Sequence, residues 1–173
     1  MKPQAGMAGT TTGRMTVENE SRTQLRRLSR ELREVHRGLM EVSRDAHEAE
    51  NGPVCGRAEL LDLLLQDERF AWLGPLSRLI VEVDELVARD PVATEAETAA
   101  MGARVQAFVS SSDDPDAFGS RYVDLLVSEP RVAMVHVGLR AVLDRYRSRG
   151  RMTPRGGPVN WPLVDETSAS RSP

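Results

Sequence analysis

Two histidines and one aspartate are the side chains of this chain best suited to chemistry. His36 and His136 lie in matching stretches, VHRGL at residues 35–39 and VHVGL at residues 135–139. Imidazole nitrogens and carboxylate oxygens bind metal ions and exchange protons near neutral pH. If the two stretches face each other, the histidines could form a metal or acid–base site together with Asp84 or Asp62. The candidate ligands are therefore His36, His136 and Asp84.

The spacing around the histidines gives this metal site little support. Carboxylate-bridged di-iron bundles use a Glu-x-x-His pair from each of two helices. Here the residue three positions before each histidine is arginine or alanine, and no two histidines are four residues apart. The pattern favours histidines that hydrogen-bond locally beside the core, so no cofactor is expected, with a bound metal kept as the alternative.

Covalent catalysis has no recognisable motif in the sequence. Cys55 lies in a loop of glycine and proline without a neighbouring histidine, and there is no Gly-x-Ser-x-Gly sequence. No catalytic residue is therefore assigned. Because Cys55 is the only cysteine, no disulfide can form within the chain, and a reducing compartment such as the cytoplasm is expected.

The elements that must position these residues are helices. Apolar residues alternate three and four positions apart in two long segments, which is the pattern of a helix with one narrow buried face. The first series is Leu25, Leu28, Leu32, Val35, Leu39, Val42 and Ala46, and the last is Val132, Val135, Leu139, Val142 and Tyr146. The first helix is predicted to end at Asn51-Gly52-Pro53, because glycine closes helices and proline cannot continue them.

Shorter helices are predicted between these two. The leucine-rich residues 57–65 suggest a helix buried on most sides, and residues 76–87 a helix that ends before Asp90-Pro91. Thr94 and Glu97 form a capping box, followed by a face of small residues suited to close packing at Ala100, Ala103 and Ala107. Asp114 and Pro115 suggest the start of a helix carrying Phe118, Tyr122, Leu125 and Leu126.

No segment alternates with the period of a β-strand, so the sequence predicts an all-α fold. We expect an antiparallel bundle of about four to six helices in which the first and last are neighbours. The predicted organisation of the chain is a disordered tail at residues 1–15, the bundle at 16–149 and a second disordered tail at 150–173. No run approaches the ~20 apolar residues that cross a bilayer, so no membrane role is expected.

A distinctive motif, FAWL followed by PLS, LIVE and DEL, occupies residues 70–86. It resembles an uncharacterised family of small bacterial all-helical proteins, over about 120 residues of this chain. In that family a histidine-bearing helix precedes the motif, where this chain has His36, whereas Gly74 replaces a larger polar residue. The resemblance implies a helical fold and no known activity.

The residues of this motif are also predicted to form part of the hydrophobic core. Its apolar members are predicted to cluster: Phe70, Trp72, Leu73, Pro75, Leu76, Leu79 and Ile80. Asp84 lies seven residues after Ser77 and should share its flank of the helix. A carboxylate beside a core needs a partner, and an arginine or histidine from the first or last helix is the expected one.

Protein association is the function that this pattern favours. The narrow apolar face from Leu25 to Ala46 could pack within the chain or against a second copy. Trp161, between Pro158 and Pro162, could anchor in a groove of a partner or fold back onto its own bundle. Nucleic-acid binding is a weaker alternative. It rests on the arginine-rich residues 140–155 and has no helix-turn-helix to support it.

Overall fold

The computed structural model describes the backbone of residues 9–110 and 118–150, which form seven α-helices and no β-strand. The helices are α1 (Gly9–Asn51), α2 (Arg57–Gln66), α3 (Glu68–Ala71), α4 (Gly74–Ala88), α5 (Glu95–Ser110), α6 (Phe118–Ser128) and α7 (Pro130–Gly150). The predicted all-α bundle is confirmed for this part of the chain. None of these helices is long and apolar enough to span a membrane.

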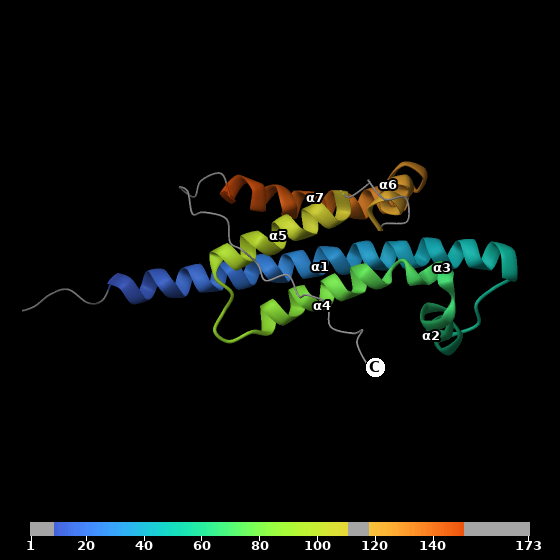
Figure 1. Cartoon of the computed structure of the whole chain (residues 1–173), viewed down its shortest axis with the longest axis horizontal. Coiled ribbons are helices and arrows are strands. Elements are labelled where there is room, and N and C mark those ends of the chain that lie inside the picture. The colour runs from blue at the N-terminus through green and yellow to red at the C-terminus, as the bar shows by residue number, and fades with distance from the viewer. Residues whose placement is uncertain (1–8, 111–117, 151–173) are drawn as a thin grey trace, which may run out of the picture.

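The helix α1 is the central helix of the bundle. With 43 residues at 1.5 Å per residue it is about 64 Å long, and it packs most extensively against α7 and α4. Its first turns extend beyond the ends of both neighbours (Figure 1). It begins at Gly9, so residues 9–15 are helical where the sequence suggested a tail. Residues 151–173 of the predicted second tail lie outside the described residues.

The first and last helices are antiparallel neighbours, as predicted. Near one end of the contact the Arg131 guanidinium donates to Asp45 over 2.7 Å, and further along a Cβ on Gly38 would lie 3.4 Å from Val135. A Cβ on Gly138 would overlap the Glu31 carboxylate. The helices α1 and α7 therefore approach closely at both glycines, although a Cβ on Gly38 would make an ordinary contact and one on Gly138 would only require the Glu31 side chain to move.

The predicted narrow face of α1 supplies the centre of the core. Its residues from Leu25 to Leu39 are fully buried, whereas Val42 is half-buried and Ala46 exposed. The burial ends there because α7 begins at Pro130 and Arg131 lies opposite Asp45. Beyond that point α7 no longer covers α1.

Two predicted helix ends are confirmed. α1 stops at Asn51, and Gly52 follows with a φ of 89°, a conformation that glycine adopts without strain. At the start of α5 the Glu97 backbone N–H donates to Thr94 Oγ1 over 3.2 Å, and the Thr94 N–H donates to the Glu97 carboxylate over 2.8 Å. The proposed cap at Asp114 and Pro115 lies outside the described residues.

The predicted burial of the leucine-rich helix is wrong for Leu61. The helix α2 packs mainly on α3 and lies at the end of the bundle, away from its middle (Figure 1). The Leu61 side chain is 54% exposed, and Leu60 and Leu63 are only half-buried. A ten-residue helix with one small neighbour cannot hide leucines on all sides.

The predicted packing face of α5 is also wrong. Its buried residues are Thr98, Met101, Gly102, Val105 and Val109, whereas Ala100, Ala103 and Ala107 are exposed along an open groove beside α7. Turning methionine and valines inward removes more apolar surface from water than turning alanines inward. The rotation of α5 follows from that difference.

Six of the seven residues predicted to cluster in the central motif belong to the core or pack against it, and Pro75 does not. Phe70, Leu73, Leu76, Leu79 and Ile80 are buried and belong to the main core, against which the half-buried Trp72 packs. Pro75 lies in the first turn of α4, where its missing N–H would have no helical partner.

Candidate functional site

His36 lies on α1 and faces α4. Its Nε2 atom is 2.9 Å from the Ser77 hydroxyl, which also donates to the Leu73 carbonyl over 3.2 Å. Burial lowers the pKa of His36 because desolvation disfavours the charged imidazolium. The side chain is therefore a neutral hydrogen-bonding group of the α1–α4 contact at pH 7.

Asp84 forms the second polar contact between the same helices. One carboxylate oxygen accepts a hydrogen bond from the Ser29 hydroxyl and the other from the Arg33 guanidinium, both over 2.6 Å. The prediction that an arginine or histidine of the first or last helix would pair with Asp84 is confirmed by Arg33. Such a charge-assisted pair is stronger than a neutral hydrogen bond.

The two contacts repeat with one heptad spacing on both helices. Ser29 and His36 are seven residues apart on α1, and Ser77 and Asp84 are seven apart on α4. Because a heptad returns to nearly the same side of a helix, the contacts flank one seam. A shift of one helix along the other would break both contacts, so they fix the register of the pair.

His136 has a different environment, between α7 and α6. Its Nδ1 atom is 2.9 Å from the hydroxyl of Tyr122, which is fully buried. Burial lowers the pKa of His136, and the charge of Arg140 lowers it further, while burial raises the pKa of Tyr122 well above its ordinary value. Both groups are neutral at pH 7.

The predicted metal ligands therefore belong to separate contacts. His36 bonds to Ser77 on α4, Asp84 to two α1 side chains, and His136 to Tyr122 on α6. Asp62 is exposed on α2. Within the part of the chain that the structure describes, no three histidine, cysteine, aspartate or glutamate side chains form a group that could hold a metal ion.

We expect the bundle to lose stability as the pH falls below about 6.5. In the unfolded chain histidines protonate near pH 6.5, whereas the folded state lowers the pKa of His36 and His136. The unfolded state then binds more protons, so the free energy of unfolding decreases with acidity. Urea unfolding at about pH 7.5 and 5.5 measures the difference.

A His36→Gln, His136→Gln double variant should show a smaller difference between the two pH values than the natural chain. Glu97, whose pKa the Arg89 and Thr94 contacts lower to about 2, does not interfere. Its contribution is lost only below its unfolded pKa, near 4.3. Equal stability of the natural chain at both pH values would contradict this prediction.

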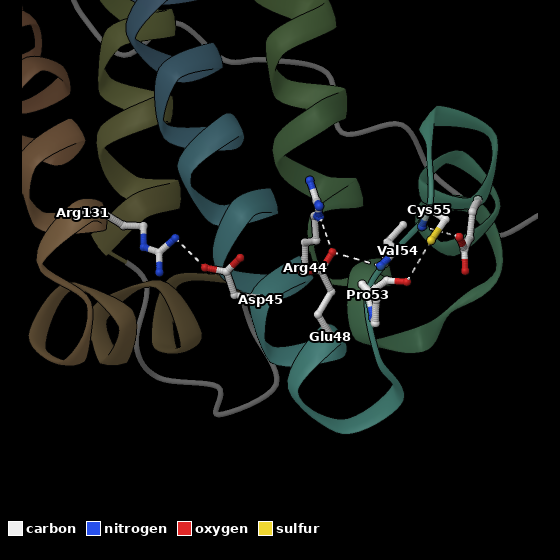
Figure 2. Close-up of polar contacts among 8 residues, drawn as sticks. Arg44, Asp45, Glu48, Pro53, Val54, Cys55 and Arg131 are labelled. Carbon is white, nitrogen blue, oxygen red and sulfur yellow. Dashed lines mark hydrogen bonds and ion pairs between the residues drawn. The ribbon is translucent and has the colours of Figure 1, made fainter.

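Cys55 lies at the corner between α1 and α2, shown in Figure 2. Its backbone N–H donates to the Glu59 carboxylate over 2.6 Å, and its exposed thiol lies 3.7 Å from the Pro53 carbonyl. Beside it, Glu48 accepts from Arg44 over 2.7 Å and from the Val54 N–H over 3.1 Å. These contacts close the chain reversal between α1 and α2.

An aromatic cluster joins three elements and was not predicted. The Phe118 ring stacks on Phe108 at 4.5 Å and on Trp72 and Tyr122 at 5.5 Å each, measured between ring centroids. The Arg121 guanidinium lies 5.0 Å from the centroid of the Trp72 ring. Tyr122 in turn contacts His136, so the cluster also explains why that histidine is held in place.

The outward side of α7 is apolar, which the sequence analysis also missed. Pro130, Met134, Val137 and Ala141 are spaced three and four residues apart and are all exposed; we call these four residues the outer α7 face. Met134 is 73% and Val137 67% exposed. Val127, at the end of the preceding helix α6, is 87% exposed. The sequence signal was a second apolar series in α7, beside the buried one.

Two arginines flank the outer α7 face without an ion pair in the described residues. Arg140 follows Val137 by three positions and Arg145 follows Ala141 by four, and both are exposed. By contrast, Arg131 already pairs with Asp45, and Arg147 lies 3.6 Å from Asp144. The face is therefore apolar in its middle, and the charges beside it are positive on balance, because Asp144 follows Ala141 by three positions but is outnumbered by Arg140, Arg145 and Arg147.

The chain matches no protein-family model, no curated protein and no solved structure. Its function is therefore inferred from the geometry of the described residues.

Proposed function

We propose that this protein is a helical interaction module that binds a protein partner through the outer α7 face. The observation that supports this proposal is that α7 is apolar on two opposite sides. Val132, Leu139 and Leu143 are buried in the core, while Met134 and Val137 are exposed to solvent. A surface helix normally carries polar residues on the side that faces away from the core.

The outward side of α1 shows what a solvated face looks like in the same molecule. It carries Arg30, Arg33, Arg37 and Arg44, which pair with neighbouring carboxylates. On α7 the residues of the outward side are uncharged, namely Pro130, Met134, Val137 and Ala141. Full burial of one valine or methionine side chain contributes about 1.5–3 kcal/mol, so covering the outer α7 face would favour association.

The other functions considered from the sequence have less support. His36, His136 and Asp84 are neutral or already paired in separate contacts, which is the arrangement of groups that stabilise a fold. Phosphate binding depends on clustered lysines or arginines, and on α7 Arg131 pairs with Asp45 while Arg147 lies beside Asp144. The single exposed Cys55 suits the reducing cytoplasm, which we propose as the location.

Site-specific photo-crosslinking in the cells that make the protein tests this proposal. A photoreactive amino acid in place of Val137 should give protein adducts, because that position lies in the proposed interface. The matched control places the same amino acid at Val81 on α4, which is exposed to 54%. Adducts several-fold more abundant at position 137 are expected, whereas equal yields at both positions, or none, would refute the proposal.

A further inference from the structure

We infer that the partner segment is an acidic amphipathic helix that lies lengthwise on the outer α7 face. This inference rests on the proposed function and specifies the partner of the same face. It depends on the length of the apolar strip, on the charges beside it, and on the poor fit of the other occupants.

The apolar strip has the dimensions of a helix–helix contact. From Pro130 to Ala141 it extends about 17 Å at 1.5 Å per residue, which is three turns. A partner helix that packs along it would present apolar residues three and four positions apart, the usual spacing of helix recognition. The side chains of Val137 and Ala141 are short, so the two helix axes can approach closely.

The net positive charge beside the strip favours acidic residues on the partner. At 100° per residue, Arg140 and Arg145 project on opposite sides of the line through Met134, Val137 and Ala141. Both arginines are exposed, and no ion pair engages them in the described part of the chain. A partner helix with glutamate or aspartate on both flanks of its apolar face would neutralise both arginines, and such complementarity sets specificity and association rate.

A second copy of this chain fits the face less well. It would bring its own Arg140 and Arg145 to the contact, so like charges would be added at the flanks of the apolar strip. A membrane surface also fits less well. Helices that bind lipid use large apolar residues such as tryptophan, phenylalanine and leucine, whereas this strip offers Met134, Val137 and Ala141.

Fluorescence anisotropy with two synthetic helical peptides tests the inference on the full chain. Each peptide has about 20 residues with leucine at heptad positions a and d, and the flanking positions are glutamate in one peptide and lysine in the other. Both are labelled and held at nanomolar concentration. The acidic peptide should bind saturably in the micromolar range and the basic peptide at least about tenfold more weakly, a difference of about 1.4 kcal/mol.

Protein variants show whether the binding uses the outer α7 face. Met134→Ser with Val137→Ser should weaken acidic-peptide binding about tenfold, and Arg140→Glu with Arg145→Glu should reverse the preference between the peptides. Val81→Ser, at an exposed valine of α4, and Arg26→Glu, at an exposed arginine of α1, are the matched controls and should leave binding unchanged. Because all these positions are exposed, the variants should remain folded.

Each other outcome overturns the inference. Absence of saturable binding up to about 1 mM, or binding that the serine variant leaves intact, would exclude an acidic helix on this face. So would a dimer in sedimentation that Val137→Ser abolishes, or adsorption to phosphatidylserine vesicles without peptide binding. If adducts still form at position 137 but the acidic peptide does not bind, this inference fails while the proposed function stands.

Discussion

Replacing Phe118 with alanine is expected to lower the free energy of unfolding by about 3–5 kcal/mol. Phe118 is 6% exposed and its ring stacks on Trp72, Phe108 and Tyr122. Truncation removes the apolar area of the ring and leaves a cavity where α5, α6 and the α3–α4 junction meet. Aromatic pairs add about 0.5–1.5 kcal/mol beyond their burial. Urea unfolding followed by circular dichroism measures the loss.

Two variants separate the stacking from the burial. Phe118→Leu keeps most of the apolar volume but loses the ring contacts, so a loss of about 1–2 kcal/mol is expected. Val127→Ala, at a side chain of the same helix that is 87% exposed, should change stability by less than about 0.5 kcal/mol. If Phe118→Ala were as mild as Val127→Ala, the cluster would not contribute to the folded core.

The sequence predicted those features that depend on local periodicity, or on a buried charge that needs a partner of opposite charge. The series from Leu25 to Leu39 has a heptad spacing, which defines both a helix and its buried side. The Thr94–Glu97 cap depends only on residues three positions apart. For Asp84, a carboxylate beside a core requires a cation, and the arginine-bearing first helix supplied it.

The features that escaped prediction depend on how separate helices rotate against each other. Trp72, Phe108 and Phe118 belong to different elements, and no local pattern indicates that their rings meet. The same holds for His36 and His136, whose matching stretches suggested a shared site. The antiparallel α1 and α7 instead direct them to Ser77 and Tyr122. Similar sequence around a residue does not determine which neighbouring helix it faces.

The outer α7 face was visible in the sequence but had no unique interpretation. Apolar residues on both sides of a helix indicate either complete burial within the chain or a surface for a partner. Only the three-dimensional structure distinguishes these, because it shows that the described helices cover one side of α7 and leave Met134 and Val137 exposed. The uncharacterised bacterial helical family suggested by residues 70–86 stays a prediction.

Replacing Gly102 with alanine is expected to destabilise the fold by about 1–3 kcal/mol. This is the opposite of the effect of helix propensity, because alanine stabilises a helix by about 1 kcal/mol relative to glycine. Gly102 is buried in α5 against Tyr146 of α7. A Cβ built on it would lie 2.5 Å from Cγ and Cδ1 of the tyrosine ring and 3.0 Å from its Cβ. These atoms are close to the tyrosine backbone, so only a shift of α5 away from α7 relieves the overlap. Thermal and urea unfolding measure the change.

The cause of that loss can be isolated with a second glycine and a double variant. Gly74→Ala, whose new methyl would have only Arg78 Nη1 within reach at 3.9 Å, should be neutral or slightly stabilising. A Tyr146→Ala background removes the two ring contacts at 2.5 Å and leaves only the Cβ at 3.0 Å, so Gly102→Ala should destabilise the protein much less. A coupling energy of about 1–3 kcal/mol between the two positions follows. If Gly102→Ala cost the same with and without the tyrosine, the close approach of α5 and α7 at this point would not be the reason for the glycine.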